Sequence, residues 1–218
     1  MSEVLASRRS VTVVCGLSGY GKNTFVLRYL VNAPLTVRYL FDPDANPEFD
    51  ATRGEFASRL QLQPATDIFS LGLSFCRGWV PFDPHTLFPG RPEDAVEFFC
   101  DWAFETAAAV PGEKAIVIDE LWKYVNPQKI PAGIRSVALS GRKHRLQLFV
   151  LTQEPHRLNE TLKAGVSEIV TFRLQGEKSL AWIEGNGFDA DLVARLEPLH
   201  WMARNLDTAG ELAGRLKV

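Results

Sequence analysis

The amino-acid sequence predicts an α/β fold in which a mainly parallel central sheet is flanked by helices. Short, continuous apolar runs alternate with segments of helical periodicity, as in strand–helix units around a sheet that is buried on both faces. The first of these runs, residues 11–15, passes into a helix through a glycine-rich turn. Two later runs end in polar side chains, at Asp119 and at Gln153. Ligands of such sheets bind at the carboxyl ends of the strands, so these positions are candidates for a site.

The first half of the chain holds two predicted strands and two predicted helices. A helix from Lys22 to about Val31 follows the glycine-rich turn, and a strand over residues 36–41 follows that helix. A second helix begins at Pro92, because proline suits the first position of a helix. Apolar side chains then recur at helical spacing until a Pro-Gly pair ends the helix; they are Val96, Phe99, Ala103 and Ala107.

The second half of the chain continues this alternation. Four apolar residues before Asp119 predict a third strand over 115–118, and a helix over 131–139 leads to a fourth strand over 147–151. A fifth strand is expected over 168–174. One or two helices and a terminal strand or hairpin complete the chain.

Residues 43–91 are rich in proline and in turn-forming residues, and their elements are the hardest to predict. A short helix near residues 54–60 and a short strand near Ile68 are expected. We interpret this stretch as an insertion at the edge of the sheet. No segment has the composition of a linker, so residues 1–218 are expected to form a single domain.

The composition is that of a soluble globular protein. Of the 218 residues 46% are hydrophobic and 23% are charged, and the formal net charge is −2. This balance provides no general attraction to nucleic acids or anionic membranes, although a small basic patch remains compatible with DNA binding. No apolar run approaches the ~18 residues of a membrane span, and the pattern of a signal peptide is missing. Three scattered cysteines argue against a disulfide framework.

Nine residues after the first strand form a phosphate-binding motif. The pattern GxxxxGK is met by Gly16, Gly21 and Lys22, in the strand-to-helix context that the motif requires. Glycines allow backbone N–H groups to turn toward phosphate oxygens, and the lysine adds a cation near the β and γ phosphates. The expected nucleotide site comprises Gly16, Leu17, Ser18, Gly19, Tyr20, Gly21, Lys22, Asn23 and Thr24.

The position after the lysine departs from the usual motif. A serine or threonine normally ligates Mg²⁺ there, whereas this chain has Asn23. An amide oxygen can also coordinate a hard cation. Thr24 is no simple substitute, because one step along a helix turns the side chain by ~100°. Nucleotide binding and hydrolysis are therefore separate expectations.

The third strand ends in two neighbouring carboxylates, which matches a Walker B element. Asp119 is expected to hold Mg²⁺, directly or through water, and Glu120 to polarise the attacking water as general base. Taken alone, the pattern also suits a buried strand that ends in a solvated turn. Gln153, at the end of the fourth strand, could contact the γ-phosphate or the attacking water, or it could be a loop amide. The basic residues at 142–145 are either a solvated charge run or the source of an arginine finger for a neighbouring subunit.

These features resemble the FtsK/HerA superfamily of ring-forming, DNA-pumping ATPases. Beyond the two Walker motifs, the stretch from Arg142 to the Thr-Gln-Glu-Pro sequence at 152–155 is similar to that superfamily's arginine, strand and proline. Residues 161–174 resemble its next helix and strand. Within the superfamily, a chain of this length is most similar to the genome-packaging ATPases of membrane-containing icosahedral viruses. The implied fold is a P-loop NTPase of the additional-strand, RecA-like class.

The resemblance also implies a function. The expected activity is ATP- and Mg²⁺-dependent translocation of double-stranded DNA by a homo-oligomeric ring, a hexamer or a pentamer. The expected location is the host cytoplasm and the packaging vertex of the virion, with capsid-vertex or membrane proteins as further partners. The roles carried over by position fall to Lys22 for phosphate, Asp119 for Mg²⁺, Glu120 as base, Gln153 as polar sensor and Arg142 as trans finger, with Arg145 and Arg173 as weaker finger candidates. Asn23 departs from the family's Ser/Thr, and it is kept as a candidate Mg²⁺ ligand through its amide oxygen.

Two alternatives remain open at this point. A small-molecule or nucleoside kinase would have a similar loop, but it would not need the water-activating Glu120. A non-hydrolysing nucleotide-binding protein of phage assembly would bind ATP without turnover, and Asn23 is the residue that favours this second alternative.

Overall fold

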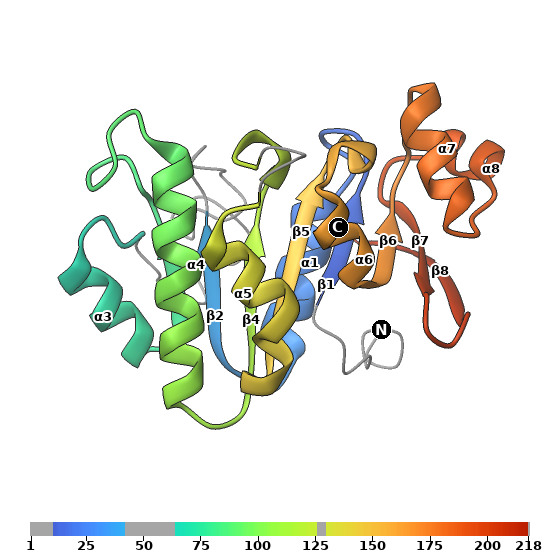
Figure 1. Ribbon diagram of the computed structural model, residues 1–218. Helices are drawn as coiled ribbons and strands as arrows, with labels where there is room; N and C mark the ends of the chain where they lie inside the picture. The colour runs from blue at the N-terminus through green and yellow to red at the C-terminus, as the bar shows by residue number, and fades with distance from the viewer. Residues whose placement is uncertain (1–10, 42–63, 126–129, 218) are drawn as a thin grey trace.

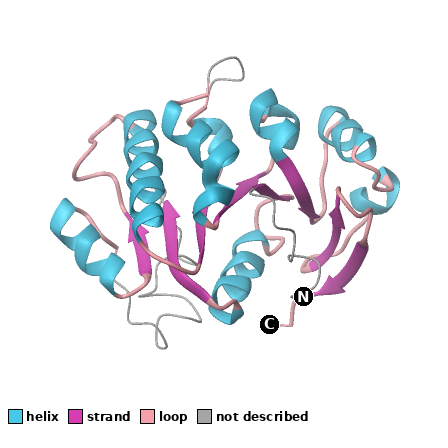
Figure 2. Ribbon diagram, turned by 60° about the horizontal axis from the view of Figure 1, so that its bottom comes forward, coloured by secondary structure: helices cyan, strands magenta, loops and turns pink. Residues whose placement is uncertain are grey.

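The computed structural model describes residues 11–41, 64–125 and 130–217. Helices lie on both faces of one central sheet (Figures 1 and 2). The strands are β1 (Val11–Cys15), β2 (Leu35–Phe41), β3 (Trp79–Phe82), β4 (Glu113–Ile118), β5 (Leu146–Thr152), β6 (Val166–Thr171), β7 (His200–Asn205) and β8 (Glu211–Arg215). The helices are α1 (Lys22–Asn32), α3 (Ile68–Cys76), α4 (Pro92–Ala109), α5 (Ala132–Ser140), α6 (Glu160–Gly165), α7 (Glu177–Gly185) and α8 (Ala190–Ala194).

The described strands join in the order β3-β2-β4-β5-β1-β6-β7-β8. All pairs from β3 to β6 are parallel, whereas β7 and β8 add an antiparallel hairpin at one end. The prediction of an α/β fold with a mainly parallel sheet is therefore confirmed, and so is the terminal hairpin. β5 lies between β1 and β4, which is the additional-strand arrangement. The carboxyl ends of these three strands meet at one edge of the sheet.

Two apolar cores, one on each face, hold the sheet in place. On β1, Val13 belongs to the core under α4 and α5, whereas Val14 belongs to the core under α1. Successive strand residues point to opposite faces, so a strand buried on both faces must be apolar at every position. Every residue of β1 is buried. Trp201 of β7 joins the α1 side, where its ring lies 5.2 Å from that of Phe25. The sheet edge that carries the site is thus rigidly supported from both faces.

The prediction of a strand near Ile68 is wrong, because this residue begins helix α3. The Asp67 carboxylate accepts a hydrogen bond from the backbone N–H of Ser70 at 2.8 Å, and the Ser70 side chain closes a capping box with the backbone of Asp67. This cap satisfies donors that a helix start leaves unpaired. The short apolar run, Ile68–Cys76, carries no polar face that would have distinguished a helix from a buried strand.

An unpredicted strand, β3, forms one edge of the sheet beside β2. It contains Pro81, which cannot donate a backbone hydrogen bond and is tolerated in edge strands. Together with α3 it places residues 68–82 at the sheet edge. The expected helix at 54–60 lies outside the described residues. That 43–91 is an insertion, and that 1–218 form a single domain, stay predictions.

Candidate nucleotide site

The loop between β1 and α1 has the backbone geometry of a phosphate-binding turn. Gly16, Gly19 and Gly21 all adopt positive φ values, of 149°, 77° and 106°. At Gly16 a Cβ atom would lie 2.6 Å from the Cβ of Phe172, so this position has no room for a side chain. Ser18 and Gly19 form the exposed tip of the turn. The sequence motif thus folds as a tight loop that opens directly into α1.

Lys22 is folded back into this loop. Its side chain is 7% exposed, and its ammonium group donates hydrogen bonds to the carbonyl oxygens of Gly16 at 2.9 Å and Leu17 at 3.2 Å. A phosphate group in the loop could take the place of these carbonyls as the partner of the cation. The role of Lys22 in phosphate binding stays a prediction.

Neighbouring strands fix the shape of the loop from three sides. The N–H of Gly16 donates to the carbonyl of Thr152 at 3.1 Å, and the N–H of Leu17 donates to that of Arg173 at 2.9 Å. The carbonyl of Tyr20 accepts from the N–H of Leu199 at 3.2 Å. The ends of β5 and β6 and the start of the terminal hairpin therefore hold the loop ready for a ligand.

Arg173 lies against the loop of its own subunit. Its Nη1 donates to the Tyr20 hydroxyl at 3.4 Å, while its Nε is buried and has no hydrogen-bond partner among the described residues. A buried donor without a partner is unfavourable and would be satisfied by an anion. Its role as a weaker trans finger stays a prediction, although Arg173 lies against the loop of the same chain.

The predicted Mg²⁺ ligands lie side by side. Asp119 directly follows β4, and its Oδ2 accepts a hydrogen bond from the amide of Asn23 at 3.4 Å. A carboxylate and an amide oxygen at the mouth of the loop are a donor set that suits a hard divalent cation. With Lys22 and the positive-φ glycines, these residues fit a nucleoside triphosphate with its Mg²⁺. Thr24 is half-buried on the next position of α1.

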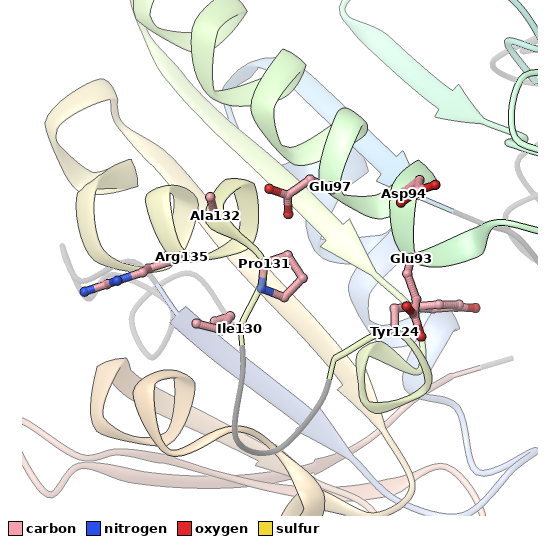
Figure 3. Close-up of a pocket in the computed structure, with 8 residues that line it drawn as sticks. All are labelled: Glu93, Asp94, Glu97, Tyr124, Ile130, Pro131, Ala132 and Arg135. Carbon is pink, nitrogen blue, oxygen red and sulfur yellow. The ribbon is translucent and has the colours of Figure 1, made fainter.

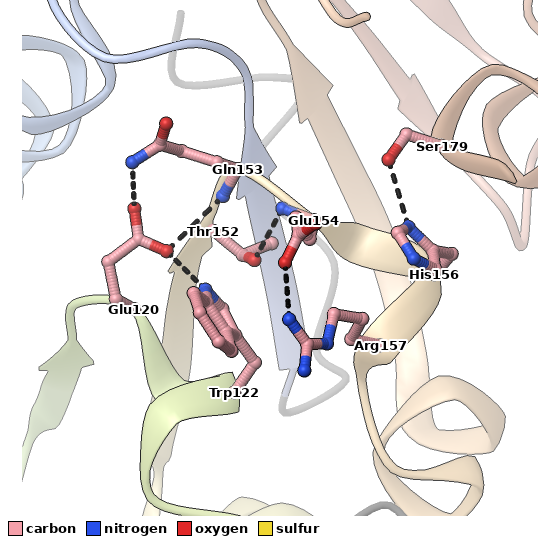
Figure 4. Close-up of polar contacts among 8 residues, drawn as sticks. All are labelled: Glu120, Trp122, Thr152, Gln153, Glu154, His156, Arg157 and Ser179. Atoms are coloured by element: carbon pink, nitrogen blue, oxygen red, sulfur yellow. Dashed lines mark hydrogen bonds and ion pairs between the residues drawn. The ribbon is translucent and has the colours of Figure 1, made fainter. Parts of the chain in front are cut away.

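Glu120 and Gln153 are in direct contact (Figure 4). Gln153 donates from its side-chain amide to Oε1 of Glu120 at 2.8 Å and from its backbone N–H to Oε2 at 3.4 Å. Glu120 is 7% exposed and has a left-handed backbone, with φ at 46°. Such a conformation is unusual for a residue other than glycine and is often found at functional sites. The predicted base and the predicted sensor thus form one unit.

Three residues of this unit were not expected from the sequence. The indole N–H of Trp122 donates to Oε2 of Glu120 at 2.6 Å. The guanidinium of Arg157 covers the Trp122 ring at 4.5 Å and donates to the carboxylate of Glu154 at 2.8 Å (Figure 4). Glu154 and Arg157 have the i,i+3 spacing that suits an ion pair. No motif in the sequence links either residue to Trp122 or to Glu120.

Arg142 lies at the amino end of β5, whereas the β1–α1 loop lies at the carboxyl ends of the strands. It belongs to a 3₁₀ turn, η2 (Gly141–His144), just before β5 begins, whereas Gln153 follows the end of β5. Arg142 is exposed. The ammonium of Lys114 holds this turn by donating to the carbonyl of His144 at 2.8 Å. Arg145 lies in the same region and forms a long ion pair, 3.9 Å, with Glu113. Both arginines therefore lie at the other end of β5 from the loop of the same chain.

A cavity of about 640 Å³, apart from the β1–α1 loop, lies between α4, α5 and the turn after β4 (Figure 3). Sequence reasoning missed it, because its lining comes from separate segments: Glu93, Asp94, Glu97, Tyr124, Ile130, Pro131, Ala132 and Arg135. Three of these side chains are acidic and only one is basic. The cavity is therefore poorly suited to the phosphates of nucleic acid.

The described residues contain no helix that is long and apolar enough to cross a membrane. No protein-family model matches the chain. No curated protein matches it either.

Solved structures do match the chain over nearly its whole length. The genome packaging NTPase B204 from Sulfolobus turreted icosahedral virus 2, in complex with AMP, aligns with a TM-score of 0.70 and 16% identity, covering 97% of this chain and 100% of that one. The same NTPase in complex with AMPPCP aligns at 0.68. VirB4 of Thermoanaerobacter pseudethanolicus aligns at 0.61 with 12% identity, covering 96% and 89%. The expected structural resemblance to a viral genome-packaging NTPase is thus found, and the chain has the fold of a P-loop NTPase.

Proposed function

We propose that this protein is an ATP-hydrolysing translocase of double-stranded DNA, the subunit of a viral genome-packaging motor that works as a homo-oligomeric ring. The observation that carries the proposal is the direct contact between Glu120 and Gln153 beside a GxxxxGK phosphate loop. A carboxylate at this place can take a proton from water, and the use of water in place of a substrate hydroxyl as the acceptor is what separates a hydrolase from a phosphotransferase. The similarity to packaging NTPases over both full lengths supports the same assignment.

Each residue at the site has a distinct proposed task. Bound ATP supplies the phosphoryl group that hydrolysis transfers, and Mg²⁺ neutralises its charge. Lys22 pairs with the phosphates, and Asp119 and Asn23 hold the cation. Glu120 takes the proton of the attacking water, while Gln153 orients that water and senses the γ-phosphate.

The ring is proposed from the placement of Arg142. Because this arginine and the nucleotide loop lie at opposite edges of one sheet, a head-to-tail contact would bring the Arg142 of one subunit to the loop of the next. Such a contact repeats in the same direction, and it forms a ring when the rotation from one subunit to the next closes. An arginine supplied in trans would then couple hydrolysis to assembly.

Host cytoplasm and virion vertex are the proposed locations, and capsid-vertex or membrane proteins are the proposed further partners.

The test is an ATPase assay with and without linear duplex DNA. We expect DNA to stimulate the parent, Lys22→Ala to lose nucleotide binding, and Glu120→Gln to bind ATP while its turnover falls by roughly 10²–10⁴-fold. Glu184→Gln, a matched change at an exposed position of α7, should behave like the parent. Parental turnover in Glu120→Gln would refute the assignment of the base. Turnover that needs a small-molecule acceptor and ignores DNA would identify a kinase.

Asn23 favours the second candidate, a nucleotide-binding assembly protein without hydrolysis. This candidate predicts that the parent binds ATP but does not turn it over. The variant Asn23→Ser restores the usual motif residue and separates the two functions. If the parent is an ATPase, Asn23→Ser should change the Mg²⁺ concentration needed for half-maximal rate while the rate stays measurable in both. If only Asn23→Ser hydrolyses ATP, the assembly protein is the correct assignment.

A further inference from the structure

The carboxylate of Glu120 is held by donors from two different strand ends. Gln153 follows β5 and approaches both oxygens, whereas Trp122 lies in the turn η1 (Leu121–Lys123) after β4 and donates to Oε2 at 2.6 Å. A hydrogen bond to an ionised group is short and strong compared with one between neutral groups. The indole contact is the shortest of the three. Trp122 is therefore well placed to decide where the carboxylate lies.

The indole is itself held in place by a contact on one face of its ring. The Arg157 guanidinium covers the ring at 4.5 Å from its centroid, and the same guanidinium donates to Glu154 at 2.8 Å. Arg157 belongs to the turn η3 (Pro155–Arg157), which follows Gln153 along the chain. Glu154 in turn donates its backbone N–H to the Thr152 hydroxyl at 3.0 Å. The ring is thus fixed between the carboxylate and a guanidinium whose own position is set by the end of β5 (Figure 4).

The backbone of Glu120 makes this support necessary. Its left-handed φ of 46° is unfavourable for a residue with a side chain and is retained only where surrounding contacts impose it. A base must be held to within about 0.5 Å of its working position to be effective. Gln153 alone cannot both hold the Glu120 carboxylate and orient the attacking water, which is its proposed task. The indole N–H of Trp122 is a second donor, and it can stay on the carboxylate while Gln153 orients the water.

We propose that Trp122 is a positioning residue for Glu120, and that Arg157 acts through it by fixing the indole ring. This inference rests on the proposed role of Glu120 as general base. Neither Trp122 nor Arg157 touches the reacting atoms. Both act on the rate of the chemical step and leave nucleotide binding unchanged.

The kinetic test uses variants that separate the N–H group from the ring. Trp122→Phe keeps an aromatic face for Arg157 but removes the donor, and Arg157→Ala removes the support of the ring. Loss of a hydrogen bond to a charged group should lower kcat by about tenfold or more, with the Kd for ATP unchanged within about twofold. Arg157→Ala should have a smaller effect in the same direction.

The chain offers matched controls for both changes. Trp182→Phe alters a partly buried tryptophan on α7. Arg91→Ala removes an arginine with the same kinds of contact, a cation–π contact with Phe88 at 6.0 Å and an ion pair with Asp94 at 3.3 Å. Both controls should keep the parental kcat. A fall in kcat of similar size in the controls would mean that the effect is general destabilisation, and would overturn the inference.

A spectroscopic arm makes the result independent of turnover. Fluorine NMR of protein labelled with 5-fluorotryptophan should show one signal for each of the five tryptophans, assigned by Trp→Phe substitution. The Trp122 signal should shift in Glu120→Gln and in Arg157→Ala, whereas the signal of Trp182 should not. An unmoved Trp122 signal, or a Trp122→Phe variant with the parental kcat, would overturn the proposal. If the parent binds ATP without turnover, the proposed function fails, and the fluorine signals still decide whether Trp122 holds Glu120.

Discussion

At the scale of single residues, burial controls the chemistry of the strand that leads into the loop. Cys15 is the last residue of β1 and is fully buried, and this burial raises the pKa of its thiol to about 12. Cys100 on α4 is also fully buried, and burial raises the pKa of its thiol well above the ordinary value. Thiolate is the reactive form of cysteine, so both residues should be inert in the folded protein. Cys76, at the end of α3, is exposed.

The first prediction follows from this difference. In the native protein at about pH 8, a thiol reagent such as dithionitrobenzoate should modify one cysteine rapidly, and in denaturant it should modify all three. Cys76→Ser should abolish the rapid phase while leaving the other two thiols to react on unfolding. Any rapid thiol in that variant would show that β1 or α4 opens readily, and would contradict the burial of Cys15 and Cys100.

The residues of the site show what a single sequence can and cannot reveal. Lys22, Asp119 and Glu120 were predictable because their roles depend on spacing along the chain within a strand-to-helix or strand-end context. Trp122 was not, because its role depends on an indole N–H that meets a carboxylate two residues away only through the unusual backbone of Glu120. The cation–π contact from Arg157 joins two strand ends that are adjacent in the sheet but distant in the chain.

At the scale of elements, the fold was predictable where periodicity was long and ambiguous where it was short. Helix α4 was found from its apolar spacing over 18 residues. By contrast, α3 is a nine-residue helix with an almost uniformly apolar sequence, which equally suits a buried strand. The deciding feature was the side-chain cap at Asp67. Strand β3 was missed because Pro81 argues against a strand unless the strand is known to lie at an edge.

The packing of α4 against α5 provides the second prediction. A Cβ atom at Gly133 would lie 2.7 Å from the backbone carbonyl oxygen of Glu97 and 2.8 Å from Oδ1 of Asp101. Gly133→Ala should therefore lower the free energy of unfolding by about 1–3 kcal/mol, as overpacking does. Gly72→Ala is the matched control in α3, where a Cβ atom meets nothing within 4 Å. It should stabilise by about 0.5–1 kcal/mol. Urea unfolding of both variants checks the prediction, which fails if Gly133→Ala is as stable as the parent.

The contact between η3 and α7 provides the third prediction. The His156 ring bonds the Ser179 hydroxyl at 2.9 Å, and burial lowers the pKa of His156 below its ordinary 6.5. The folded protein therefore takes up this proton less readily than the unfolded chain. The contribution of His156 to stability is intact above the unfolded pKa and is lost as the pH falls from that value through the lower folded one. Acidification from about pH 7.5 to about pH 5.5 should lower the unfolding free energy of the parent more than that of His156→Asn. Equal losses in urea titrations would contradict it.

At the scale of the whole molecule, the parallel strands give the sheet a direction, with different groups at their carboxyl ends and at their amino ends. The nucleotide loop, Glu120 and Gln153 lie at the carboxyl edge, and the basic turn with Arg142 lies at the other. The net charge of −2 therefore hides an uneven distribution, with Lys22, Arg157 and Arg173 near the carboxyl ends of the strands and the basic residues at 142–145 near the amino end of β5. A net charge near zero is compatible with few contacts to DNA phosphates, and few such contacts would make DNA binding depend only weakly on salt.

This direction leads to the fourth prediction, which concerns mixed rings. Arg142→Ala subunits keep an intact loop and base, whereas Glu120→Gln subunits keep an intact finger. Each variant alone should be nearly inactive if Arg142 acts in trans. In a random one-to-one mixture, half of the sites have an intact base and half of their neighbours supply an intact arginine, so about a quarter of the parental ATPase rate should return.

The matched control mixes Lys22→Ala with Glu120→Gln. Each of these substitutions damages the site of the subunit that carries it. Every site in a mixed ring therefore lacks either Lys22 or Glu120, and no activity should return. The measurement is the steady-state ATPase rate at constant total protein while the ratio of the two variants is varied. The rate should pass through a maximum near equal proportions for the Arg142 pair and stay flat for the control pair. A flat profile for both pairs would place Arg142 outside the catalytic interface and leave the basic turn as a solvated charge run, whereas a maximum would show that the two edges of the sheet meet between subunits.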